Sequence, residues 1–250
     1  MSSQRNLPGN DVSLSPRQCT ASALRATLLL VFWTVIFACK AILFDLDGVL
    51  VDSTPAVARV WGAWAIEHRL DPKVAISHAH GRRSIETIRA LLPHMDAEKE
   101  NRNVEQMEIA EKEGVVALPG AAQLLHALPP ERFAVVTSAT RKLALARLQY
   151  AGLPTPPNLV SANDVVHGKP APEPYLKGAA LLGFAAADCL VLEDAPAGIA
   201  SARAAGMQVL ALKTTYPLDQ LTGADAVLAS LADMKAAWNK DGISLNVTLR

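Results

Sequence analysis

Two aspartates, Asp45 and Asp47, follow a short run of apolar residues. Asp45 and Asp47 come directly after residues 41–44, in the segment FDLDG. Other polar residues stand at comparable places further along the chain: Ser138, Lys169, Glu193 and Asp194. Together they would supply carboxylates, one hydroxyl and one ammonium group to a single crevice. Carboxylates can act as nucleophiles and as general acids or bases.

Each of these residues also has a simple structural explanation when it is taken alone. Asp favours turns and Gly48 accepts unusual dihedral angles, so the pattern after the first run is typical of a turn. Glu193 and Ser138 stand where a residue could cap the next helix, and Lys169 could be an exposed loop residue. The joint occurrence of these residues, in this order and after these runs, favours a shared site.

The elements that would position these residues are visible as an alternation of short apolar runs with helix-forming stretches. The runs cover residues 41–44, 133–136, 159–160, 189–192, 209–212 and 226–228. The helix-forming stretches between them include residues 142–151, 174–182 and 198–205. This alternation predicts an α/β fold with a Rossmann-like parallel sheet, and we expect the run at 226–228 to close it. Ligands bind such sheets at the carboxyl ends of the strands, where the candidate residues stand.

One long interval, from residue 53 to about residue 123, lacks a comparable strand. Residues 55–69, 84–92 and 97–113 have helical patterns. We therefore predict a helical cap over residues 55–117, inserted after the first strand, and a core domain made of residues 40–54 and 118–250. Trp61 and Trp64 have helical spacing and are expected in the interior of this cap.

The balance of basic and acidic residues indicates which kinds of molecule the protein binds. The chain has 250 residues, of which 50% are hydrophobic, and 24 basic residues balance 24 acidic ones. With no basic excess to attract nucleic acid or an anionic membrane, we expect neither as a partner and predict a small-molecule substrate. The cysteines, Cys19, Cys39 and Cys189, have neither metal-site nor disulfide spacing, which favours a reducing compartment.

The first 39 residues form a predicted extension. Residues 1–20 are polar and are expected to be disordered, whereas residues 26–39 are continuously apolar and resemble the apolar part of a signal peptide. This stretch is short for a membrane-spanning helix, which needs roughly 20 apolar residues. The first core strand begins directly after it, at Lys40. We expect a cytoplasmic enzyme with a non-essential extension, and the alternative is export or membrane anchoring through residues 26–39.

The sequence resembles the haloacid dehalogenase-like hydrolase superfamily. The resemblance is carried by ILFDLDGVLVDS, VVTSAT, GKPAPEPY and VLEDAPAG, which occur in this order at residues 42–53, 135–140, 168–175 and 191–198. ISHAHGRRSIETI, at residues 76–88, is similar to sugar phosphatases and to glycerol-phosphate and deoxyglucose-phosphate phosphatases. The resemblance implies a phosphatase with a helical cap.

The resemblance also implies roles for the residues of the core. Asp45 would attack phosphorus and form an aspartyl-phosphate, and Asp47 would protonate the leaving group and later activate water. Mg²⁺ would be held by the side chains of Asp45 and Asp194 and the backbone carbonyl of Asp47, with Glu193 as an alternate ligand. Dehalogenases lack the second aspartate because a halide leaves without a proton, so Asp47 favours phosphate esters.

Substrate binding is expected from the core and from the cap. Ser138, with the backbone N–H groups near Ala139, would bind phosphoryl oxygens, and Lys169 would offset their charge. In the cap, His80 and Arg83 are candidates for contact with the rest of the substrate. Exposed arginines are also common without any function.

Three functions remain open from the sequence. The first is a phosphatase of a small sugar or polyol phosphate, expected to be a monomer. The second is a phosphosugar mutase of the β-phosphoglucomutase type, which would use Asp45 and Asp47 but return the phosphoryl group to another hydroxyl. The third is a non-catalytic, membrane-tethered binding protein that uses the fold as a scaffold, and the complete set of site residues argues against it.

Overall fold

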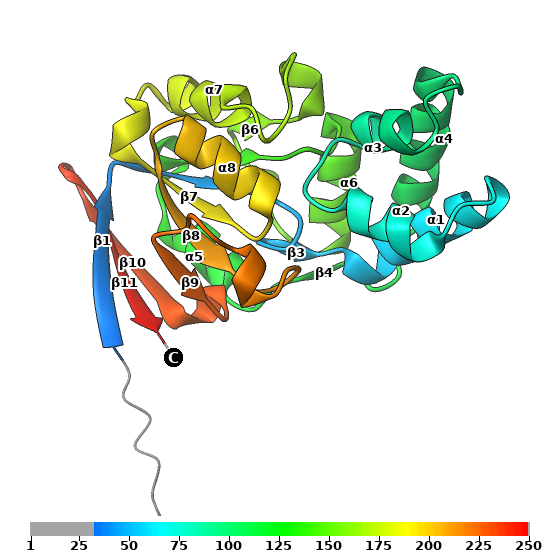
Figure 1. The fold of residues 1–250 in the computed structure, drawn as a ribbon. Coiled ribbons are helices and arrows are strands. Elements are labelled where there is room, and N and C mark those ends of the chain that lie inside the picture. The colour runs from blue at the N-terminus through cyan, green and yellow to red at the C-terminus, as the bar shows by residue number, and fades with distance from the viewer. Residues whose placement is uncertain (1–32, 250) are drawn as a thin grey trace, which may run out of the picture. The chain divides into compact units, whose positions relative to one another are not determined.

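The computed structural model describes residues 33–249, and its centre is a six-stranded sheet with the order β6-β5-β2-β7-β8-β9 (Figure 1). All neighbouring strands of this sheet are parallel. The strands are β2 (Ala41–Phe44), β5 (Phe133–Val136), β6 (Leu159–Val160), β7 (Cys189–Glu193), β8 (Gln208–Leu212) and β9 (Ala226–Leu228). The predicted α/β fold and the six predicted strands are confirmed.

Apolar side chains alternate between the two faces of the sheet. In β2, Ile42 and Phe44 belong to one buried cluster, and Leu43 belongs to the other. The first cluster is covered by α5 (Ala121–Ala127) and α6 (Arg141–Tyr150), and the second by α7 (Glu173–Leu182) and α8 (Pro196–Ala204). Strands covered on both faces must be apolar throughout, which explains the continuous runs in the sequence.

The cap consists of helices inserted after β2. They are α1 (Thr54–Glu67), α2 (Pro72–Ala79), α3 (Ser84–Leu91) and α4 (Ala97–Ala110). The chain enters and leaves the cap through β3 (Val51–Asp52) and β4 (Val116–Ala117), which pair with each other as antiparallel strands. Trp61 and Trp64 are buried in the cap's own apolar cluster, as their spacing predicted.

A second sheet differs from the sequence-based expectation. β1 (Trp33–Cys39), β10 (Met234–Asn239) and β11 (Gly242–Leu249) form a three-stranded antiparallel sheet, in which β11 lies in the middle. Residues 33–39 were expected in the extension, and β9 was expected to be the last strand. The alternating residues Ile243, Leu245 and Val247 of β11 are buried in the core cluster, so the protein uses this segment and its partners to cover one face of the main sheet.

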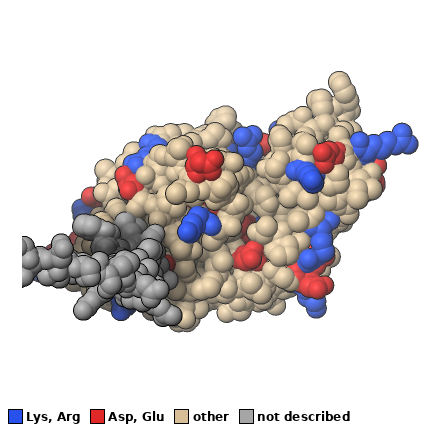
Figure 2. All heavy atoms as spheres, turned by 60° about the horizontal axis from the view of Figure 1, so that its bottom comes forward, with Lys and Arg blue, Asp and Glu red and all other residues tan. Residues whose placement is uncertain are grey.

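Short 3₁₀ helices occur at Pro130–Arg132, Ala162–Asp164, Ala186–Asp188, Leu218–Gln220 and Leu231–Asp233. None of the helices within residues 33–249 combines the length and apolar character that crossing a membrane requires. Residues 1–20, which were predicted to be disordered, lie outside the described residues. The same is true of residues 26–32 of the apolar stretch. On the face drawn in Figure 2, basic and acidic side chains are interspersed over its described part.

Candidate active site

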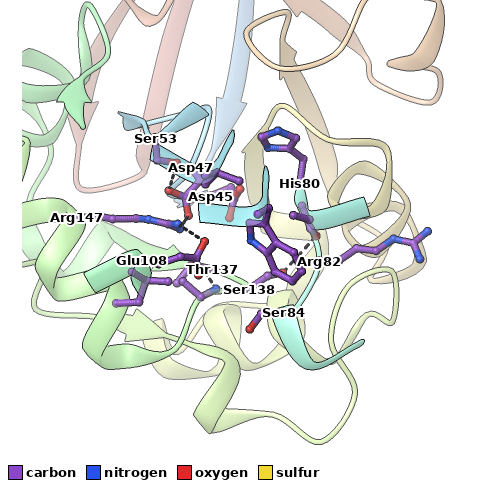
Figure 3. Close-up of a pocket in the computed structure, with 16 residues that line it drawn as sticks. Asp45, Asp47, Ser53, His80, Arg82, Ser84, Glu108, Thr137, Ser138 and Arg147 are labelled. Atoms are coloured by element: carbon purple, nitrogen blue, oxygen red, sulfur yellow. Dashed lines mark hydrogen bonds and ion pairs between the residues drawn. The ribbon is translucent and has the colours of Figure 1, made fainter. Parts of the chain in front are cut away.

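A cavity of about 60 Å³ lies between the cap and the carboxyl ends of β2 and β5 (Figure 3). The core lines it with Asp45, Asp47, Ser53, Thr137, Ser138, Ala139, Leu143 and Arg147. The cap lines it with Val57, Trp61, Ala79, His80, Gly81, Arg82, Ser84 and Glu108.

Lys169 is a buried ammonium group that connects the nucleophile candidate to a second carboxylate. Its side chain is 1% exposed, and Nζ donates to Asp45 Oδ1 at 2.8 Å, Glu193 Oε1 at 2.7 Å and the Val136 carbonyl at 3.1 Å. All three of its donors are therefore used. Burial lowers the pKa of Lys169, but the two neighbouring carboxylates outweigh burial and raise it overall, so the ammonium group stays charged.

Glu193 is held in place by groups around both of its oxygens. Oε1 accepts from Lys169 and from the Tyr175 hydroxyl at 2.8 Å, and Oε2 accepts from the backbone N–H groups of Asp194 and Ala195 at 2.9 and 3.0 Å. A carboxylate has about four lone-pair sites, and four donors are present here. The predicted role of Glu193 as an alternate metal ligand is not favoured by this arrangement, which instead orients Lys169.

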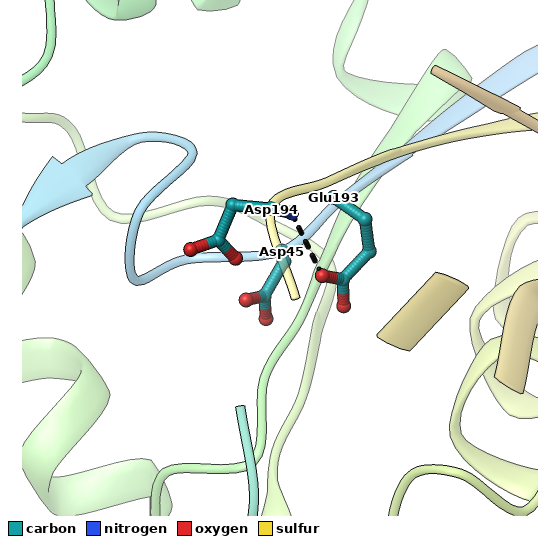
Figure 4. A group of neighbouring side chains, drawn as sticks. All are labelled: Asp45, Glu193 and Asp194. Atoms are coloured by element: carbon teal, nitrogen blue, oxygen red, sulfur yellow. Dashed lines mark hydrogen bonds between the residues drawn. The ribbon is translucent and has the colours of Figure 1, made fainter. Parts of the chain in front are cut away.

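Asp45, Glu193 and Asp194 form a buried acidic cluster with ligand atoms within 4.8 Å of one another (Figure 4). Burial raises the pKa of Asp45 to about 7, against the opposing effect of Lys169. Burial, followed by the charges of Glu193 and Asp45, also raises the pKa of Asp194 well above its ordinary value. Two buried carboxylates that repel each other when both are ionised are stabilised by a divalent cation between them, so the carboxylate oxygens of Asp45 and Asp194 fit Mg²⁺.

Gly48 allows this cluster to form. It has a φ of 76°, in the left-handed region that glycine tolerates. A Cβ at this position would lie 1.9 Å from Asp194 Oδ2. The glycine that follows Asp47 is therefore required both for the turn after β2 and for the approach of Asp194.

Asp47 is fixed from two sides in the cavity. Ser53 Oγ donates to Asp47 Oδ1 at 2.7 Å, and Arg147 Nη1 donates to Asp47 Oδ2 at 2.7 Å. Arg147 Nη2 also donates to Oε1 of Glu108, in cap helix α4, at 3.0 Å. Asp45 and Asp47 thus line one cavity, as predicted, but the partners of Asp47 were not predicted.

The sequence contained a signal for Arg147. It lies on the same face of α6 as Leu143, Ala144 and Leu148, all of which are buried. A charged residue within an apolar stripe at helical spacing is unusual and calls for a partner. Glu108 gave no comparable signal, because it stands in a helix with many other charged residues.

The predicted phosphate-binding residues lie between β5 and α6. Ser138 lines the cavity, and its Oγ donates to the Gly81 carbonyl of the cap at 3.3 Å. The Ala139 N–H donates to Thr137 Oγ1, and Thr140 caps α6 by accepting from Leu143 N–H. The Arg141 N–H donates to Asn163 Oδ1 at 2.8 Å. The N–H groups of Ala139, Arg141 and Leu143 therefore already have partners within the protein, and Ser138 is the predicted phosphate-binding side chain that lines the cavity.

The two predicted cap residues have different environments. His80 lines the cavity, and burial lowers its pKa, which favours the neutral imidazole. Arg83 is outside the lining: its Nε donates to Glu86 at 2.7 Å, and its Nη1 donates to the Val166 carbonyl of the core at 3.1 Å. The structure thus places Arg83 at a contact between cap and core, and Arg82 in the lining.

The chain is similar to several known proteins. An Escherichia coli protein named hexitol phosphatase A is 43% identical over 209 residues, covering 82% of this chain and 97% of that protein. Glycerol-1-phosphate phosphohydrolase 2 of Saccharomyces cerevisiae is 39% identical over 195 residues, covering 73% of this chain and 78% of that protein. A solved structure of a hydrolase from Pseudomonas syringae has a TM-score of 0.70 and 27% identity, covering 78% of this chain and 95% of that one.

The match to a whole family extends over the cap and most of the core. Haloacid dehalogenase-like hydrolases match residues 39–206, which include every predicted site residue. This range also includes the cap loop at His80 and the cluster around Asp194. The chain therefore belongs to the haloacid dehalogenase-like hydrolase family.

Proposed function

We propose that this protein is a magnesium-dependent phosphatase that hydrolyses a small sugar or polyol phosphate. The position of Asp45 carries the proposal: its buried carboxylate lines the cavity, 2.8 Å from Lys169 Nζ, with Asp47 in the same lining. The names of the similar hexitol and glycerol-1-phosphate enzymes support this class of substrate.

The reaction would follow two steps. In the first, an Asp45 carboxylate oxygen forms a bond to phosphorus, the bond from phosphorus to the ester oxygen breaks, and Asp47 gives a proton to the leaving alkoxide. In the second, water attacks phosphorus, Asp47 takes its proton, and the aspartyl-phosphate bond breaks to release inorganic phosphate. Lys169, fixed by Glu193, offsets negative charge at Asp45 during both steps.

The residues that would hold Mg²⁺ are the carboxylates of Asp45 and Asp194 and the backbone carbonyl of Asp47. When bound, the ion would neutralise part of the charge of the phosphate and of these carboxylates, which otherwise repel each other. We assign Glu193 to holding Lys169, because its lone pairs are already used. Ser138, in the cavity lining, would bind the phosphoryl oxygens.

A phosphate-release assay over sugar, polyol and nucleotide monophosphates tests the proposal. We expect magnesium-dependent release that is fastest with small polyol or sugar phosphates. Asp45→Asn should retain the fold, checked by circular dichroism, and lose activity by more than about 1,000-fold because the covalent intermediate cannot form. Activity of this variant close to that of the wild type would show that Asp45 is not the nucleophile.

The reaction products distinguish a mutase from a phosphatase. A phosphatase releases inorganic phosphate in step with the loss of substrate. An isomerised sugar phosphate that forms only with a bisphosphate primer would instead establish the mutase. The cytoplasmic location and the monomeric state stay predictions, and size-exclusion chromatography with light scattering tests the second.

A further inference from the structure

Arg147 is a buried residue that connects the cap to the acid–base candidate. It belongs to core helix α6, its side chain is 8% exposed, and its two terminal nitrogens contact different carboxylates. Nη1 lies 2.7 Å from Asp47 Oδ2, and Nη2 lies 3.0 Å from Glu108 Oε1. Glu108 comes from cap helix α4 and is itself buried. Figure 3 shows the three side chains in a row along one side of the cavity.

The contacts leave the Asp47 carboxylate with little freedom. Ser53 donates to one oxygen and Arg147 to the other, so rotation of the carboxylate would break both hydrogen bonds. A planar guanidinium group that contacts two carboxylates through separate nitrogens has a fixed direction, unlike a lysine ammonium group. The direction of Arg147 is in turn set by Glu108 of the cap.

We propose that Arg147 is a positioning residue that holds Asp47 in line with the leaving-group oxygen, with Glu108 of the cap keeping the guanidinium in place. The proposal rests on the proposed phosphatase function. It gives the cap a part in acid–base chemistry, because α4 must lie against α6 for the Arg147 guanidinium to be oriented.

The position of α4 on α6 has support apart from this ion pair. The Tyr150 hydroxyl donates to the Ile109 carbonyl at 2.7 Å, and Thr140 Oγ1 donates to Glu105. Both contacts join the same two helices without reaching Asp47. Loss of the Arg147 contacts should therefore affect the orientation of Asp47 more than the packing of the helices, which makes the two roles separable.

The test compares two small phosphate donors that differ in their need for a proton. Glycerol phosphate loses an alkoxide and needs a general acid, whereas acetyl phosphate loses acetate, which leaves as a stable anion. For Arg147→Met we expect kcat/KM to fall about 10- to 100-fold with glycerol phosphate and less than about 3-fold with acetyl phosphate. Arg147→Lys keeps the positive charge but lacks the two separate guanidinium nitrogens. Its kcat/KM with glycerol phosphate should lie between those of Arg147→Met and the wild type.

Three further variants make the result decisive. Glu108→Gln should show the same selective loss of kcat/KM in a weaker form. If Arg147→Met folds poorly because it leaves the buried Glu108 charge unpaired, the double variant Arg147→Met with Glu108→Gln removes that charge. Arg89→Met on α3, whose ion pair with Glu98 is exposed, should match the wild type with both donors. Equal losses with both donors, or none, would overturn the positioning role. If the wild type does not turn over glycerol phosphate, the fastest sugar or polyol phosphate of the panel takes its place, and absence of turnover with the whole panel would instead refute the proposed function.

Discussion

Gly198, the last residue of the VLEDAPAG segment, shows how closely the backbone must approach the site. It lies in α8, and a Cβ there would stand 1.5 Å from Glu193 Oε1. The side chain that holds Lys169 therefore occupies the space that any residue other than glycine would fill. This requirement arises from packing, because the residue lies within a regular helix.

At the residue scale, we expect Gly198→Ala to lower both stability and activity. Overpacking of this kind costs about 1–3 kcal/mol, and displacement of Glu193 should release Lys169 from its position beside Asp45. The free energy of unfolding in urea and the rate of phosphate release are the measurements. Gly62→Ala in α1 is the control: its nearest atom would be 3.9 Å away, so it should be neutral or stabilising by up to about 1 kcal/mol. Equal behaviour of the two variants would contradict the packing argument.

The residues of the site were predictable to different degrees. Asp45, Asp47, Ser138 and Asp194 are visible because they are polar residues directly after apolar strands. Arg147 and Glu108 are in helices, where a charged residue is ordinarily exposed, and their proximity depends on how the cap packs on the core. The apolar stripe around Arg147 indicates that its side chain is buried, but no local pattern in the sequence identifies Glu108 or Asp47 as its partners.

At the element scale, β11 explains why the second sheet was missed. Its residues alternate between buried and partly exposed, which is typical of a strand covered on one face. The strands of the main sheet are buried on both faces and appear as continuous apolar runs. β1 was interpreted as part of an apolar extension because its residues, WTVIFAC, suit a signal peptide and a strand equally.

We expect Leu245→Ala in β11 to destabilise the whole protein by about 2–5 kcal/mol, because it leaves a cavity in the core cluster. Leu245 is fully buried and pairs with Phe37 of β1. Asn246→Ala changes the other face of the same strand and should shift stability by less than about 0.5 kcal/mol. Urea unfolding of both variants measures this. A small effect of Leu245→Ala would mean that the antiparallel sheet is dispensable.

At the scale of the whole molecule, the acidic cluster connects stability to pH and to Mg²⁺. The ordinary pKa of an aspartate is 3.8, whereas burial raises the pKa of Asp45 to about 7 in the folded protein and also raises the pKa of Asp194. Between these values the unfolded chain binds fewer protons than the folded one. The contribution of these groups to stability therefore decreases as pH rises through this interval.

Without Mg²⁺, we expect the stability of the wild type relative to Asp194→Asn to fall as pH rises from about 4 to about 7. Added Mg²⁺ should raise the melting temperature of the wild type, more so at higher pH, and should have little effect on Asp194→Asn. Thermal unfolding in EDTA and in Mg²⁺ measures both effects. Asp219→Asn, an exposed substitution, should follow the wild type. Parallel pH curves for wild type and Asp194→Asn would exclude the cluster as the cause.

The sheet order has a consequence for how the protein is made. β2 is the first strand of the main sheet in the chain, yet it lies between β5 and β7. Lys169, which contacts Asp45, follows it by 124 positions. At about 5–20 residues per second, a ribosome reaches Lys169 about 6–25 s after Asp45. The nascent chain therefore carries its nucleophile long before the charges around it exist, and hydrolysis can begin only when the central strands have assembled.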